Sequence, residues 1–155
     1  MAELTCFKAY DIRGEIGVEI NENIAYRIGR AVAQHLKVKN LVIGFDARKT
    51  SCNFSNAAAQ GVMDAGSNVL NIGMAGTEEM YWAVTEFGAC AGIEVTASHN
   101  PINYNGMKIV KSGSRPLDDV EDFQVIRSLA EAQKWLNVKT IGETLNIAAD
   151  ARQKY

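Results

Sequence analysis

The sequence predicts an α/β fold, a three-layer sandwich whose mixed, mostly parallel sheet carries one antiparallel strand. Segments with apolar residues at helical spacing alternate with short apolar runs that are typical of buried strands. Glycines follow two of the helical segments, where helices commonly end. One connection between two expected strands, residues 97–106, is shorter than a parallel crossover usually needs. We therefore expect these two strands to run antiparallel within an otherwise parallel sheet.

The first half of the chain alternates helix, strand, helix and strand. Residues 22–36 place apolar side chains at helical spacing, and Asn21 before them is a suitable N-cap. Residues 41–45 form a short apolar run, as expected of a buried strand. A second helical pattern covers residues 54–65, and residues 69–72 form the next expected strand.

The second half continues the alternation. Thr77, followed by two acids, is expected to cap a helix that ends at Gly88. Two more apolar runs, residues 92–96 and 107–110, predict strands, and apolar spacing over 120–130 predicts the last full helix.

Several polar positions have a purely structural interpretation. His35 lies on the apolar side of its helix and is expected to be a packed core histidine. The pair Asn105 and Gly106 suits positive φ in a tight connection. Residues 147–155 have helix-forming composition without a C-terminal glycine, as in a helix cut short. A group of acids reads as the solvated first turn of the last helix: Asp118, Asp119, Glu121 and Asp122.

Composition excludes several classes of function. The chain has 155 residues, about the size of one domain, with 47% hydrophobic and 22% charged residues. Its net charge of −2 leaves no general basic field, so nucleic-acid binding is disfavoured. No apolar stretch approaches the length of about eighteen residues that suggests a membrane span, and the start does not read as a signal peptide. Three scattered cysteines without a C-x-x-C pair favour a reducing compartment, so we expect a cytoplasmic protein without a membrane partner.

The most unusual segment follows the strand predicted over residues 92–96. It contains Ser98 beside His99 and should emerge at the carboxyl end of that strand, where ligands gather in α/β sheets. A plain surface turn is the simplest alternative. A serine hydrolase is disfavoured because the chain has no G-x-S-x-G elbow, and no P-loop or dinucleotide-binding pattern occurs.

Three segments together resemble the α-D-phosphohexomutase family. Residues 96–101 (Thr-Ala-Ser-His-Asn-Pro), followed by 104–108 (Tyr-Asn-Gly-Met-Lys), resemble its phosphoserine loop. Residues 7–14 (Phe-Lys-Ala-Tyr-Asp-Ile-Arg-Gly) resemble its N-terminal active-site segment. Residues 44–48 (Gly-Phe-Asp-Ala-Arg), with Ser51 after them, resemble its G-x-D-x-R-x-S segment. Within the family, the chain is most similar to the bacterial phosphomannomutase branch, which supplies GDP-mannose.

The resemblance implies a four-domain enzyme much longer than this chain. Residues 1–137 would be its first domain, which carries the phosphoserine, and residues 138–155 would be an interdomain segment and a truncated first helix of the next domain. The implied reaction interconverts mannose 6-phosphate and mannose 1-phosphate through a 1,6-bisphosphate, and glucose or mannose 1,6-bisphosphate would be the activator. The implied partners are the sugar phosphate and the remaining domains, so the fragment alone should be inactive.

Two alternatives to that reaction stay open. The sugar can differ, as in a phosphoglucomutase or a phosphoglucosamine mutase, because the segments that choose it lie outside this chain. A polypeptide of this length can also be a non-catalytic module that binds phosphate.

The resemblance also implies roles for individual residues. Ser98 would carry the phosphoryl group, and Mg²⁺ would bind through it with its remaining ligands outside this chain. Lys108, Arg13 and His99 would be the other catalytic residues. The simpler interpretations are a solvated Lys108 and a loop ion pair between Arg13 and Asp11.

Substrate binding and structural support are assigned in the same way. Asp46 and Arg48 would not be catalytic but would fix the active-site loops. Tyr10 has a buried core tyrosine as its simpler interpretation. The implied substrate-binding residues are Tyr10, Arg13, Asn100 and Lys108.

Overall fold

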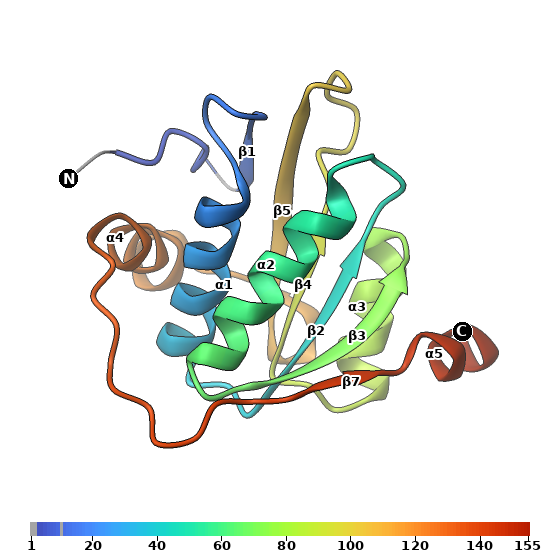
Figure 1. Cartoon of the computed structure of the whole chain (residues 1–155). Helices are drawn as coiled ribbons and strands as arrows, with labels where there is room; N and C mark the ends of the chain where they lie inside the picture. Colours follow the sequence, from blue (N-terminus) through green and yellow to red (C-terminus); the bar gives the residue numbers. More distant parts are fainter. Residues whose placement is uncertain (1–2, 10) are drawn as a thin grey trace.

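A mixed β-sheet forms the middle layer of the molecule (Figure 1). A computed structural model describes residues 3–9 and 11–155. Its strands are β1 (Ile12–Glu15), β2 (Asn40–Phe45), β3 (Asn68–Met74), β4 (Ala91–Val95), β5 (Tyr104–Lys111), β6 (Arg115–Pro116) and β7 (Thr144–Asn146). Its α-helices are α1 (Glu22–Leu36), α2 (Ser51–Asp64), α3 (Thr77–Glu86), α4 (Gln124–Ala132) and α5 (Ala148–Lys154). The alternating pattern predicted from the sequence is therefore confirmed.

The sheet has the strand order β1-β5-β4-β2-β3-β7, and β6 pairs with β5. Strands β4, β2, β3 and β7 pair in parallel. Strand β5 is antiparallel to β4, β1 and β6, so it alone among the described strands opposes the common direction. The short connection between β4 and β5 explains this arrangement, and the predicted mixed sheet with one antiparallel strand is confirmed.

Helices cover both faces of the sheet (Figure 1). One face packs against α1, α2 and α4 through a core that includes Ile28, Ile43 and Met107. The other face packs against α3 and α5, with Val42 and Met80 among its buried residues. Alternation along each strand sends successive side chains to opposite faces, which is how neighbours such as Val42 and Ile43 enter different cores.

Two helix starts differ from the sequence prediction. Helix α2 begins at Ser51, three residues before the apolar pattern that predicted it. Gly76, and not Thr77, occupies the N-cap of α3, and its backbone N–H donates to Glu79 Oε1 at 3.1 Å. The predicted N-cap of α1 is confirmed, because the Asn21 side chain accepts from the backbone N–H of Ile24 at 2.8 Å.

The pair Asn105 and Gly106 lies within β5 and not in a turn, so the prediction of positive φ was wrong. A Cβ on residue 106 would lie 1.9 Å from the carbonyl oxygen of Ile12. Glycine is required here because strand β1, the antiparallel neighbour of β5, lies close to residue 106, a contact between residues far apart in the sequence.

The acidic segment before α4 is solvated as expected except at Asp122, which is buried. Residues Asp119–Phe123 form a π-helical turn, and Val120 is 73% exposed, so it does not contribute to the core as its spacing suggested. Asp122 is buried, with Oδ1 2.9 Å from His35 Nε2 and Oδ2 accepting from Lys111 Nζ at 3.0 Å. Burial raises the pKa of this carboxyl, but the hydrogen bonds from Asp118, His35 and Lys111 outweigh it and lower the pKa to about 2. His35 is thus held by an ionic partner and not by apolar packing alone.

The C-terminal part of the chain adds β7 beside β3 and then α5, which buries Ala151. The helix expected over residues 147–155 is confirmed as α5, whereas β1 and β7 were not predicted.

The domain boundary expected at residue 137 remains a prediction. Over the described residues, the structure contains no helix with the length and apolarity needed to cross a bilayer.

Candidate active site

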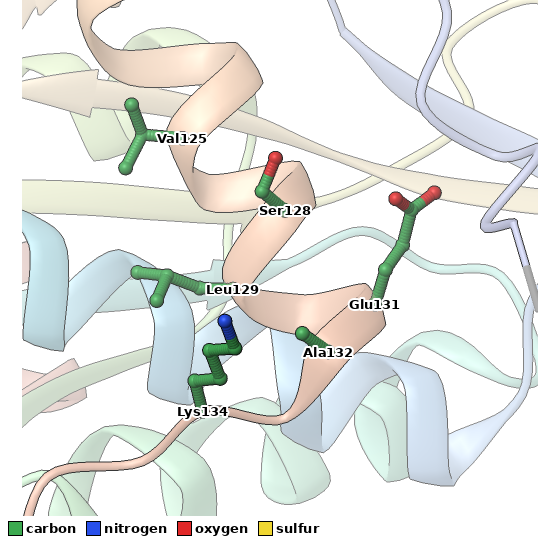
Figure 2. Close-up of a pocket in the computed structure, with 6 residues that line it drawn as sticks. All are labelled: Val125, Ser128, Leu129, Glu131, Ala132 and Lys134. Atoms are coloured by element: carbon green, nitrogen blue, oxygen red, sulfur yellow. The ribbon is translucent and has the colours of Figure 1, made fainter. Parts of the chain in front are cut away.

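The loops that follow β2 and β4 meet at the carboxyl edge of the sheet. They enclose an open hollow of about 500 Å³. The residues lining it are Asp46, Ala47, Arg48, Ser98, Asn100 and Ile102. Another hollow, on the outer face of α4, is smaller at about 290 Å³ and is lined by that helix and Lys134 (Figure 2). Of these two hollows, the one at the sheet edge brings together segments that the sequence singled out, those around Arg48 and Ser98.

Ser98 has a backbone conformation that is rare for a residue with a side chain. Its φ is 52°, in the left-handed region, and the residue is exposed. Its backbone N–H donates to Thr96 Oγ1 at 3.0 Å, which ties the serine back to the end of β4. A non-glycine residue in this region costs about 1–2 kcal/mol, so the surrounding contacts must enforce it.

Arg48 supplies those contacts. Its Nη1 donates to the carbonyl oxygens of Pro101 at 2.8 Å and Tyr104 at 3.1 Å. Its Nη2 donates to the carbonyl oxygens of Ser98 at 3.0 Å and Asn100 at 2.7 Å. One guanidinium group therefore gathers four carbonyls of the loop, and the planar fork of arginine suits this task in a way that a lysine ammonium does not.

Asp46 holds Arg48 in turn. Its Oδ1 accepts from the Arg48 backbone N–H at 3.0 Å and from Ser51 Oγ at 2.5 Å, and its Oδ2 lies 3.5 Å from Arg48 Nε. Through its hydrogen bond with Ser51, Asp46 therefore links Arg48 and the loop to the start of α2. This geometry supports the structural role expected for Asp46 and Arg48.

Two cations approach the loop from β1 and β5. Arg13 Nη1 donates to Asn100 Oδ1 at 2.6 Å, and Arg13 Nη2 lies 3.0 Å from Asp11 Oδ2. Lys108 Nζ is 3.7 Å from the same Asp11 oxygen. The ion pair between Arg13 and Asp11 is therefore present together with the contact to the loop. Asp11 draws Arg13 and Lys108 together, and Arg13 brings a positive charge to Asn100, two residues after Ser98.

Two expected site residues are not placed by contacts. His99 is exposed, and its side chain makes no hydrogen bond within the described part of the chain. Tyr10 lies outside the described residues. The structure thus brings together the remaining candidates: Arg13, Asp46, Arg48, Ser98, Asn100 and Lys108.

Sequence reasoning missed two buried polar residues beside this site. Asn105 is fully buried on β5 and bonds to the start of α2. Glu94 is fully buried on β4, and neither carboxyl oxygen has a hydrogen-bond partner among residues 3–9 and 11–155. Burial, followed by the nearby charges of Asp46 and Glu79, raises the pKa of Glu94 to about 9. The sequence did contain a signal for Glu94, because an acidic residue stands in the middle of an otherwise apolar strand.

The described residues do not form a magnesium site by themselves. No three His, Cys, Asp or Glu side chains within residues 3–9 and 11–155 are grouped to hold a metal ion. The hydroxyl oxygen of Ser98 is one potential ligand, and the Asp46 carboxylate is already occupied by Ser51 and Arg48. Mg²⁺ takes a near-octahedral set of oxygens, which this part of the chain does not provide.

Comparisons with known proteins match most of the chain to one family. Residues 5–135 match the family described as phosphoglucomutase/phosphomannomutase, alpha/beta/alpha domain I. A phosphomannomutase of Klebsiella pneumoniae is 54% identical over 135 residues, which cover 87% of this chain and 86% of that protein. A phosphomannomutase of Escherichia coli is also 54% identical over 135 residues, but these cover only 30% of its length.

The fold agrees as well. A crystal structure of a phosphoglucomutase/phosphomannomutase family protein from Burkholderia thailandensis superposes with a TM-score of 0.84 at 29% identity. The match covers 97% of this chain and 35% of that one. The resemblance seen in the sequence is confirmed, and the chain belongs to the phosphoglucomutase/phosphomannomutase family, of which it contains the alpha/beta/alpha domain I.

Proposed function

We propose that this chain is the phosphoserine domain of a phosphomannomutase, with Ser98 as the residue that carries the phosphoryl group. The observation that carries the proposal is the exposed, left-handed Ser98 on a loop whose carbonyls are gathered by Arg48. Phosphoryl transfer depends mostly on positioning and on neutralising charge, so a rigidly presented hydroxyl beside cations suits the reaction.

In the proposed reaction, phosphorylated Ser98 gives its phosphoryl group to the free hydroxyl of mannose 1-phosphate or mannose 6-phosphate. The bond between phosphorus and Ser98 Oγ breaks, and a bond between phosphorus and the sugar oxygen forms, which yields the 1,6-bisphosphate. The proton of the sugar hydroxyl passes to Ser98 Oγ, with Lys108 as its carrier. After the bisphosphate turns round, its other phosphoryl group returns to Ser98 and the proton moves back.

The other site residues are proposed to bind the sugar phosphate or to hold the loop that carries Ser98. Arg13 has its guanidinium beside Asn100, where it can pair with a phosphate of the substrate in two parallel hydrogen bonds. Asn100, which accepts a hydrogen bond from Arg13, and the exposed His99, next to Ser98 in the chain, are proposed to hydrogen-bond the substrate. Asp46 and Arg48 act on the loop and not on the substrate.

This domain is proposed to work within a longer cytoplasmic enzyme whose other domains supply sugar recognition. Mg²⁺ would bind through the oxygen atoms carried by Ser98, with its remaining ligands on those domains, and would neutralise charge during transfer. Glucose or mannose 1,6-bisphosphate would prime the enzyme. The isolated chain is expected to lack mutase turnover because the groups that position the sugar are absent.

The test uses the complete protein that contains this domain. Ser98→Ala should abolish conversion of mannose 1-phosphate in a coupled assay, and intact mass after incubation with glucose 1,6-bisphosphate should show no added phosphoryl group. The unfolding midpoint should stay near wild type, because an exposed hydroxyl contributes about half a kcal/mol at most. Ser112→Ala, at another exposed serine, is the matched control and should retain activity.

Normal turnover by Ser98→Ala would overturn the mechanism. Lys108→Ala should lie between wild type and the serine variant, since proton-transfer groups contribute about 10²–10⁴-fold. Faster conversion of glucose 1-phosphate or glucosamine 1-phosphate than of mannose 1-phosphate would keep the mechanism but contradict the proposed sugar.

A further inference from the structure

A buried amide joins the end of the active-site loop to the start of helix α2. Asn105 follows the last clamped loop residue, Tyr104, and its side chain is fully buried. Its Nδ2 donates to Thr50 Oγ1 at 2.9 Å and to Ser51 Oγ at 3.0 Å. Its Oδ1 accepts from the backbone N–H of Gly106 at 2.9 Å.

These partners fix the orientation of the amide. The backbone N–H of Gly106 can only donate, so it requires the oxygen of the Asn105 amide on its side. The NH₂ group must then face the two hydroxyls. Both of its protons are used, and no freedom remains for the amide to flip.

The amide also sets the direction of the next hydrogen bond. Because Ser51 Oγ already accepts a proton from Asn105, its own single proton is free to point at Asp46 Oδ1, 2.5 Å away. Asp46 holds the backbone N–H and Nε of Arg48, and Arg48 gathers the loop carbonyls from Ser98 to Tyr104. The chain of contacts therefore starts at one end of the loop and returns to it.

We propose that Asn105 is a positioning residue that sets the conformation of the loop carrying Ser98, acting through Ser51, Asp46 and Arg48. Its importance for catalysis rests on the proposed function of Ser98, but its effect on the loop does not. This series of contacts, which begins at the buried Asn105 and Ser51, explains how an exposed serine is kept at a φ of 52° although its own side chain lies in solvent.

Asn105→Asp tests the direction of the hydrogen bonds while it preserves the size of the side chain. A carboxylate at residue 105 cannot donate to Ser51, so the Ser51 proton is drawn toward it and away from Asp46. A protonated carboxyl group can donate again. The loop that carries Ser98 should therefore be loosened strongly at about pH 8 and less toward about pH 5, since burial near Asp46 favours the neutral form of the new acid.

The experiment measures amide hydrogen exchange of the 155-residue chain, with rates corrected for the intrinsic effect of pH. In Asn105→Asp at about pH 8, the hydrogen-bonded amides of the loop, those of Ser98, Asn100 and Tyr104, should exchange about tenfold faster than in wild type, the effect of losing roughly one hydrogen bond. Amides in the middle of β2 and β4 should keep their protection. Asn103→Asp places the same charge at an exposed position of the same loop and should leave the loop at wild-type rates.

Ser51→Ala is the second variant, and it removes the relay without adding a charge. It should loosen the same loop at both pH values, with no recovery in acid. Wild-type exchange of the Ser98, Asn100 and Tyr104 amides in both variants would overturn the proposal. So would faster exchange that is uniform over the whole sheet, or that does not recover in acid in Asn105→Asp. No sugar phosphate is present, so the result stands apart from any failure of the Ser98 mechanism.

Discussion

Glu94 and Gly44 are paired neighbours on β4 and β2, and the carboxyl group of Glu94 lies where a side chain on residue 44 would begin. A Cβ on Gly44 would be 2.6 Å from Glu94 Oε1. The glycine therefore makes room for a fully buried acid whose carboxyl group has no hydrogen-bond partner in the part of the chain that the structure describes. Such an acid is costly to ionise, which makes the stability of the fold sensitive to pH.

Glu94→Gln should remove a pH dependence of stability. The pKa of Glu94 is raised to about 9, so between its ordinary value of 4.5 and 9 the folded chain holds a proton that the unfolded chain releases. Stability therefore falls as pH rises through this window, with a limiting slope of about 1.4 kcal/mol per pH unit. Urea unfolding at about pH 6 and pH 8.5 should show that the free energy of unfolding of the wild type falls between these two pH values. The decrease should be smaller in Glu94→Gln. Glu86→Gln, at an exposed position, should behave as wild type, and equal slopes in all three proteins would refute the prediction.

Ser98→Gly should be more stable than Ser98→Ala by about 1 kcal/mol. Glycine adopts the left-handed conformation of residue 98 without strain, whereas alanine keeps the Cβ that opposes it. Urea denaturation of the two variants measures the difference. The same pair of substitutions at Ser112, whose φ is not positive, should not favour glycine. Equal stability at position 98 would show that the loop relaxes once the serine is removed.

Gly106→Ala should destabilise the fold by about 3 kcal/mol or more, because the new Cβ would meet the Ile12 carbonyl oxygen at 1.9 Å. Strand β1 would have to separate from β5, and Arg13, which pairs with residue 106, would move with it. Unfolding and amide exchange of β1 measure the effect. Gly76→Ala, where the nearest atom is 3.9 Å away, should cost much less. A Gly106→Ala protein as stable as this control would contradict the close approach of the strands.

Asp122→Asn should lower the free energy of unfolding by about 2 kcal/mol at neutral pH, and this decrease should be smaller in acid. The pKa of Asp122 is lowered from 3.8 to about 2, so its contribution is present above its unfolded pKa and is lost as pH falls from about 4 to 2. Urea unfolding at neutral pH and at about pH 2.5 compares the two regimes. Glu121→Gln, at an exposed neighbour, is the control. An Asp122→Asn defect that is equally large at both pH values would place its origin in packing and not in charge.

The sequence by itself was enough to predict the elements whose signal is local. Apolar spacing predicted α1 and β2, and the length of one connection predicted that β5 opposes β4. The short motifs located the loop around Ser98 and the segment around Arg48, because they are contiguous in the chain. These features depend on residues only a few positions apart, and such residues interact in any fold that contains the element.

Only the tertiary structure decided which distant residues meet. Arg48 reaches the carbonyl of Asn100 across 52 positions, and His35 meets Asp122 across 87. For the same reason the edge strands β1 and β7 and the packing of Gly106 went unpredicted, since a strand at an edge is stabilised by the neighbour that it pairs with. Periodicity reports which face of an element is apolar, but the partner on that face depends on how strands are ordered in space.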